Sequence, residues 1–133
     1  MSKVEYPRPA GLMINPAYSH VAVASGTRTI YTAGQVATDE NGAVVGAGDI
    51  GAQTEQVLRN LVLALEAGGA TFADVVKITT YVVNYKPEHR PIIAKARAPF
   101  FAGRTPPAST LVGVQALAAP EWLIEIEAIA VVG

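Results

Sequence analysis

The stretch "LIEIEAIAVV", residues 123–132, places two carboxylates where chemistry could occur. Side chains alternate along a strand, so Glu125 and Glu127 share one face with apolar neighbours, while the opposite face is wholly apolar. A charge in such surroundings is costly unless it is paired, solvated or protonated. Three interpretations stay open: a solvent-exposed sheet face, an ion pair across a subunit interface, or a carboxylate that binds or activates water.

A second candidate region is "RTPPASTLVGV", residues 104–114. Two prolines stop the preceding element, and the hydroxyl side chains Ser109 and Thr110 stand where an alternating apolar strand begins. Farther upstream, Gly34 in "TAGQV" interrupts another expected strand. A glycine inside a strand is typical of a bulge or of the close approach of a ligand or another backbone segment.

The residue types of this chain give little indication of a metal or cofactor site. His20 and His89 are the only histidines and lie far apart, without the spacing of metal ligands. The chain has no cysteine, which excludes thiolate nucleophiles, thiolate metal sites and disulfides. It also lacks the P-loop, the GxSxG elbow and the dinucleotide fingerprint. We therefore expect no metal site, a solvated helix face for His89 and a packing role for His20.

The composition of the chain favours one domain, over residues 1–133, that self-associates. Half of the 133 residues are hydrophobic and only 16% are charged. A domain of this size cannot bury so many apolar side chains alone, which indicates subunit contacts. The net charge of −1 gives no electrostatic reason to expect nucleic acid or an anionic membrane as a partner. Without a signal peptide or an apolar run of about 18 residues, we expect a soluble cytoplasmic protein.

The elements that must position these residues follow from periodicity and turn signals. Apolar alternation predicts strands over 20–25, 29–36, 75–83, 109–117 and 123–132, the first two joined by a turn around Gly26. Asn41-Gly42 predicts a hairpin whose short second arm lies near Val44.

Two helices complete the pattern. A helix begins at the N-cap Asp49 and ends at Gly68-Gly69, with an apolar stripe and with Gln53 among its polar positions. A second helix covers 87–98 and ends at Pro99. This order of elements predicts an α+β fold, in which two helices cover one face of a mixed or largely antiparallel sheet.

Several segments together resemble the reactive-intermediate deaminase family (RidA, also called YjgF). They are "PAYSHVAV", "IYTAGQV", "TEQVLRNLVLALEAGGATFADVVKITTYV", "PPASTLVGVQAL" and "IEIEAIAVV". The resemblance runs from about residue 15 to residue 132. It implies a chorismate-mutase-like fold, in which three subunits pack their sheets into a central barrel and small-molecule sites lie in the clefts between subunits.

The resemblance also implies an activity. Active members hydrolyse enamines and imines to a 2-keto acid and ammonia, without a cofactor or a metal. An arginine that follows Pro-Ala clamps the substrate carboxylate, a glutamate of the last strand helps to hold the water, and a tyrosine near the N-terminus lines the pocket.

These roles carry over residue by residue. The glutamate corresponds to Glu125 and the tyrosine to Tyr18. Gly34 and Gln35 correspond to a pocket strand, and Ala33 stands where many members have Ser or Thr. Pro107-Ala108 aligns with Pro-Ala, so Ser109 occupies the arginine position.

A serine donates one neutral hydrogen bond and cannot supply the charge or the two-pronged fork of an arginine. Its loss should weaken carboxylate binding by on the order of 2–4 kcal/mol. Arg104 on the Pro-Pro loop, or Arg97 near the end of the second helix, could restore the charge from another direction. Two functions therefore stay open: a hydrolytic deaminase for a non-standard substrate, or a non-catalytic trimer that binds a small metabolite or acts as a chaperone-like interaction module.

Overall fold

The computed structural model describes residues 3–133, so Met1 and Ser2 of the expected domain lie outside the described residues. In chain order the elements are β1 (Lys3–Glu5), β2 (Val23–Ser25), β3 (Arg28–Tyr31), α1 (Ile50–Ala67), the 3-10 helix η1 (Phe72–Asp74), β4 (Val75–Val83), α2 (His89–Phe101), β5 (Ala108–Val114) and β6 (Ile124–Val132).

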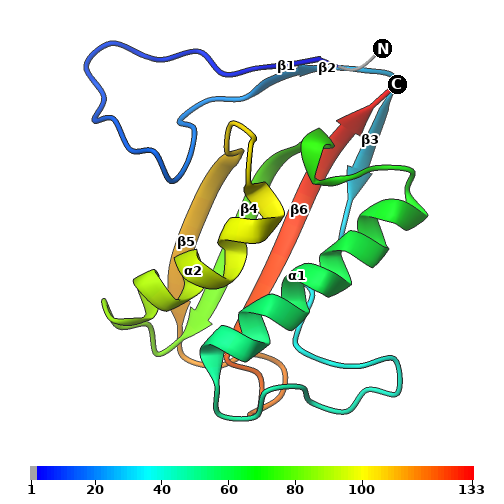
Figure 1. Cartoon of the computed structure of the whole chain (residues 1–133), viewed down its shortest axis with the longest axis vertical. Helices are drawn as coiled ribbons and strands as arrows, with labels where there is room; N and C mark the ends of the chain where they lie inside the picture. Colours follow the sequence, from blue (N-terminus) through cyan, green and yellow to red (C-terminus); the bar gives the residue numbers. More distant parts are fainter. Residues whose placement is uncertain (1–2) are drawn as a thin grey trace.

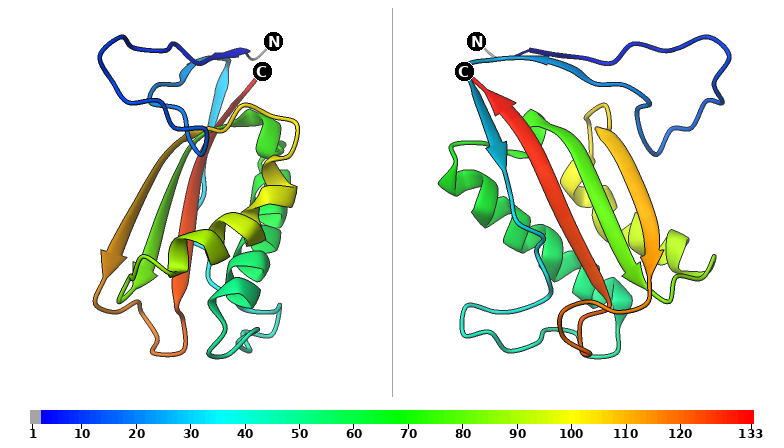
Figure 2. Two further views of the ribbon diagram at one scale, coloured as in Figure 1. Left: turned by 60° about the vertical axis from the view of Figure 1, so that its left-hand side comes forward. Right: turned by 180° about the vertical axis from the view of Figure 1, so that it is seen from behind.

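The main sheet has the strand order β3-β6-β4-β5. β6 runs antiparallel to both β3 and β4, whereas the edge strand β5 runs parallel to β4. Both α-helices lie on the same face of this sheet, and within residues 3–133 no helix or strand covers the opposite face (Figures 1 and 2). This is the mixed α+β sheet that the order of elements predicts.

The hydrophobic core lies between α1 and the apolar face of β6. The even-numbered side chains of β6, from Ile124 to Val132, are all buried, as alternation predicts. They meet the apolar stripe of α1, whose fully buried members include Leu58, Leu61 and Leu65. Asp49 caps α1 by accepting a hydrogen bond from the N–H of Ala52.

Gln53 departs from the expected polar face of α1, because it is fully buried. Its Nε2 donates to the carbonyl oxygens of Gly46 and Glu121, and its Oε1 accepts from the N–H of Leu123. One amide side chain thus satisfies three backbone groups of two loops. It holds the segment that leads directly into β6.

β3 ends at Tyr31 instead of continuing to residue 36, because the pairing with β6 contains one extra residue. Thr32 donates to the carbonyl of Ala128, but the next backbone pair joins Gln35 with Ile126. Three steps along one strand therefore match two along the other, which is a bulge. The interruption expected at Gly34 is confirmed.

The N-terminal strand is shorter than predicted. Within residues 20–25 only β2 is a strand, and it pairs with β1 outside the main sheet. Residues 20–22 find no strand partner, since Ser19 already bridges to Ala108 at the far edge of the sheet. The turn at Asn41-Gly42 is confirmed, although its arms meet only at the bridge between Thr38 and Val44.

Two predicted boundaries near the site are also wrong. α2 continues past Pro99 to Phe101, because the packing of the residues after Pro99 offsets the hydrogen bond that proline cannot donate. Phe100 and Phe101 stack edge-on against Phe72, with ring centroids 5.8 and 5.0 Å apart. β5 ends at Val114 instead of residue 117, because its partner β4 ends at the paired residue Val83.

Candidate functional site

The uncovered face of the sheet carries Glu125. In the register of β6 with β4, Glu125 lies opposite Tyr81 and Glu127 lies opposite Thr79, so all four side chains share the face without helices. Within residues 3–133, the carboxylate of Glu125 has neither a hydrogen-bond donor nor an ion-pair partner. The carboxylate is therefore available to a ligand, to water or to a neighbouring subunit.

The bulge brings Gly34 directly against this carboxylate. A Cβ at position 34 would lie 2.6 Å from Cδ of Glu125, far inside van der Waals contact. Only glycine allows the two groups to lie this close. Partial burial, with the repulsion of Glu127 added, raises the pKa of Glu125 above its ordinary value. A carboxyl group with a raised pKa is suited to exchanging protons with a bound molecule.

Glu127 has a different environment, although it is only two residues away. Its Oε1 accepts a hydrogen bond of 3.3 Å from the Tyr81 hydroxyl. Burial, followed by the charges of Glu127 and Glu125, raises the pKa of Tyr81, which keeps the hydroxyl protonated as the donor. The cation on this face, Lys77, instead donates to the Thr110 hydroxyl at 2.6 Å. Glu127 is held in place, whereas Glu125 is not.

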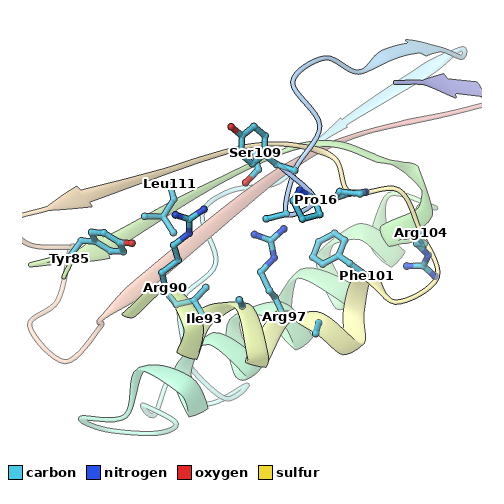
Figure 3. Close-up of a pocket in the computed structure, with 14 residues that line it drawn as sticks. Pro16, Tyr85, Arg90, Ile93, Arg97, Phe101, Arg104, Ser109 and Leu111 are labelled. Carbon is cyan, nitrogen blue, oxygen red and sulfur yellow. The ribbon is translucent and has the colours of Figure 1, made fainter. Parts of the chain in front are cut away.

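A cavity of about 560 Å³ opens on the other face, between α2 and the edge strand β5 (Figure 3). Ser109 and Leu111 of β5 form one wall, and α2 forms the other. Ser109 belongs to this face because it pairs with the buried Ile78. The N-terminal loop closes one end through Tyr18. That loop is fastened to the strand by Ser19, which donates through its backbone and its hydroxyl to the carbonyls of Pro107 and Pro106.

Three arginines line this cavity. Arg90 and Arg97 extend from α2 toward the strand that carries Ser109 (Figure 3). Arg104 lies at the far end beyond Phe101, where its Nη1 donates to the carbonyl of Phe100 at 3.1 Å. The lining contains no aspartate or glutamate. The cavity is therefore cationic, and its volume suits a small metabolite.

The structure brings some of the predicted site residues together and separates others. Tyr18, Ser109 and Arg104 line one cavity, on the helix side of the sheet. Glu125 and Gly34 are adjacent on the opposite side, and the exposed Ala33 precedes Gly34 in the bulge. Within one chain, the sheet itself lies between these two groups.

Sequence reasoning missed Arg90 and Tyr85 as cavity residues. A signal for Arg90 exists, since Arg90 and Arg97 are seven residues apart and therefore lie on one face of a helix. The sequence does not show that this face of the helix is directed into the cavity between α2 and β5.

The two histidines have local partners. Nε2 of His20 lies 2.6 Å from the carbonyl oxygen of Met13, and its ring packs edge-on against Tyr18. Nδ1 of His89 accepts a hydrogen bond from the N–H of Lys86. Over residues 3–133, the structure gathers no group of three or more His, Cys, Asp or Glu side chains that could hold a metal ion. In that same part of the chain, neither helix combines the length and the apolar character that a membrane span requires.

Comparisons with known proteins find one matching family model and several similar chains. The family model described as Endoribonuclease L-PSP matches residues 12–132. A RutC family protein of Pyrococcus horikoshii is 38% identical over 101 residues, which are 76% of this chain and 77% of that protein. The 2-iminobutanoate/2-iminopropanoate deaminase of Rattus norvegicus is 32% identical over 118 residues, or 88% and 81% of the two chains.

The solved structures include a protein of the same architecture over nearly its whole length. It is YyfB of Yersinia pestis, described as a protein of unknown function of the conserved Rid family. It superposes with a TM-score of 0.91 at 45% identity and covers 97% of this chain and 98% of its own. The fold expected for one subunit, a mixed sheet with two helices on one face, is therefore confirmed, and the trimer stays a prediction.

Proposed function

Because the chain belongs to the Rid (YjgF) family, to which the Endoribonuclease L-PSP model corresponds, we propose that it forms a homotrimer whose subunit clefts bind a small metabolite and hydrolyse an enamine or imine. The name of the rat relative, an iminobutanoate and iminopropanoate deaminase, supports this reaction class. The proposed site uses side chains alone, without a metal or cofactor.

The observation that carries the proposal is the placement of Glu125. Its carboxylate has a raised pKa, no partner within residues 3–133, and a glycine kept small beside it. The cavity with Ser109 and Tyr18 lies on the other side of the same sheet. Glu125 of one subunit can act on a ligand in such a cavity only if the cavity belongs to a neighbouring subunit. A trimer meets this requirement if the open sheet face of one subunit packs against the β5 edge of the next subunit.

In the proposed reaction, Glu125 accepts a hydrogen bond from a water molecule and orients it toward the C=N carbon. The water oxygen bonds to that carbon, and its proton passes through the carboxylate to the nitrogen. The hydroxyl proton of the resulting carbinolamine then passes through the same carboxylate to the amino nitrogen, and the carbon–nitrogen bond breaks. Ammonia leaves, and the carbonyl product keeps the water oxygen, so atoms and charges balance.

A second candidate function is binding without turnover, and Ser109 favours it. The hydroxyl lines the cavity at the position where the resemblance implies an arginine clamp. A neutral donor holds a carboxylate less firmly than a bidentate guanidinium does. A trimer with this cavity could retain or carry a metabolite, or present its surface to a partner, without catalysing its hydrolysis.

The deciding measurement is ammonia and keto-acid release from 2-iminopropanoate generated in situ. We expect slow but measurable turnover by the wild-type protein, and at least about a hundredfold less with Glu125→Gln, because the water loses its proton acceptor. Ser109→Arg should raise turnover about tenfold or more by restoring a charged clamp.

Glu66→Gln is the matched control, since Glu66 is an exposed glutamate of α1, outside the cavity lining. It should leave turnover unchanged. Wild-type turnover that survives Glu125→Gln would refute the assigned role of Glu125. If neither the wild-type protein nor Ser109→Arg releases ammonia, while a small molecule still binds, the second candidate function is correct.

A further inference from the structure

Arg90 and Arg97 form a pair on one face of α2. They are seven residues apart, or two helical turns, which puts their Cα atoms about 10.5 Å apart along the helix axis. Both side chains extend into the space between α2 and β5, with Ser109 and Leu111 on the facing wall (Figure 3). A molecule in the cavity would therefore meet two guanidinium groups at once.

Neither guanidinium is neutralised within residues 3–133. The ion pairs there join Lys3 with Glu5 and Arg59 with Glu55, and the guanidinium of neither Arg90 nor Arg97 donates a hydrogen bond. The Arg97 guanidinium lies 5.0 Å from the centroid of the Phe101 ring. A ring contact of this kind is not a conventional hydrogen bond, so the N–H groups of Arg97 remain available to a ligand.

Two like charges beside one cavity repel each other, and neither can be relieved by losing a proton, because arginine remains charged at neutral pH. Burial disfavours the charge of Arg97 further, as the lowered pKa of that side chain indicates. The lining supplies no carboxylate in compensation. Arg104 differs, since its head already donates to a backbone carbonyl.

We propose that Arg90 and Arg97 bind the two negative charges of a small dicarboxylate-type ligand, along the α2 wall of the cavity. Arg97 is partly buried and Arg90 is exposed, so a ligand with one carboxylate would pair with Arg97 and leave Arg90 to solvent, whereas a dianion pairs with both. The anion-binding charge then comes from the helix, and the facing Ser109 supplies a neutral hydroxyl on the strand side. This inference rests on the proposed function, because the proposed site combines this cavity, which binds the ligand, with Glu125 of a neighbouring subunit.

The test is calorimetric titration of the purified oligomer at constant ionic strength. The probes are dicarboxylates from malonate to adipate, each compared with the monocarboxylate of the same carbon number. We expect the best dicarboxylate to bind at least about tenfold more tightly than its monocarboxylate. Arg90→Gln and Arg97→Gln should each remove about ten- to hundredfold of its affinity.

Arg59→Gln is the matched control, because it deletes one positive charge from the exposed side of α1, outside the cavity. Its affinity should equal that of the wild-type protein. Equal binding of monocarboxylate and dicarboxylate, or an effect of only one of the two α2 variants, would overturn the inference. The inference would also be overturned if both variants dissociated the oligomer but left dicarboxylate affinity unchanged. The two arginines would then pair with carboxylates of a neighbouring subunit instead of with a ligand.

Failure here can be told apart from failure of the proposed function. Ammonia release that requires Glu125, together with dicarboxylate binding that both α2 variants leave unchanged, would overturn the dicarboxylate inference and keep the hydrolytic function. Arginine-dependent binding of dicarboxylates without any ammonia release dependent on Glu125 would keep the inference and overturn the hydrolytic function.

Discussion

At the scale of single residues, the two carboxylates of β6 have different roles, although they share one face of one strand. The Tyr81 hydroxyl donates to Glu127, which fixes that side chain. Glu125 packs against Gly34 and has no donor within residues 3–133. Its charge therefore opposes folding at neutral pH. A protein retains such a group at a cost in stability when the group serves a function.

The cost can be measured through its pH dependence. Because burial and the nearby Glu127 raise the pKa of Glu125, the folded protein binds this proton more tightly than the unfolded chain does. Stability therefore falls as pH rises from the ordinary pKa through the raised one. We expect Glu125→Gln to raise the melting temperature near neutral pH and to lose that gain at about pH 3.5, below the ordinary glutamate pKa.

Thermal unfolding followed by circular dichroism at both pH values measures the effect, with Glu66→Gln as the exposed control. A melting temperature that drops near neutral pH in Glu125→Gln would mean that a neighbouring cation compensates the carboxylate in the assembled protein.

At the scale of elements, α1 positions the strand that carries Glu125 through one buried amide. Gln53 accepts a hydrogen bond from the N–H of Leu123, the residue just before β6, and donates to the loops on either side. These backbone groups of the loops are not paired with a strand, so the Gln53 side chain supplies their hydrogen bonds instead. The start of β6, and with it the position of Glu125, depends on the rotation of α1.

We expect Gln53→Met to lower the free energy of unfolding by about 2–4 kcal/mol, because it keeps the side-chain volume but leaves buried backbone groups unsatisfied. Urea unfolding measures this loss. Gln56→Met is the matched control on the same helix, since Gln56 is only half-buried and its Nε2 donates to the Thr38 carbonyl and to Asn60. A loss in Gln53→Met no larger than in Gln56→Met would refute the anchoring role.

At the scale of the whole molecule, the two faces of the sheet are unequal. The helices cover one face (Figure 2), and the other exposes apolar side chains such as Tyr31 and Val112. Tyr31 pairs with Ile129 and Val112 with Tyr81, so both lie on the face of Glu125. Apolar surface of this kind, continuous with a candidate site, is typical of a subunit interface.

The proposed trimer predicts a species of about three times the 13.9-kDa chain mass in sedimentation equilibrium. Val112→Lys should shift it toward monomer, because a lysine within a packed interface loses its hydration without gaining a partner. Leu63→Lys should not, although Leu63 is 64% exposed against 39% for Val112. Leu63 lies on α1, on the other side of the sheet. A wild-type monomer would rule the trimer out, and equal effects of both variants would show that the face of Val112 is not its interface.

Much of the fold could be predicted from the sequence, because local patterns encode it. The alternation of β6, the apolar stripe of α1 and the cap at Asp49 depend on neighbours in the chain, and all three are confirmed. Boundaries that depend on distant partners were wrong: Pro99 lies within a turn held by Phe72, and β5 stops where β4 does.

The sequence by itself determined the inventory of the site: the unusual carboxylates of β6, the glycine of the bulge, and a serine where the resemblance implies an arginine. Only the tertiary structure decided their arrangement. Strand register and the covering of one sheet face by α2 depend on contacts between residues that are far apart in the chain. They put Ser109 with Arg90 and Arg97 on one side and Glu125 on the other. Side-chain alternation gives the faces of each strand, but only packing against the helices decides which face is buried and which is left for another subunit.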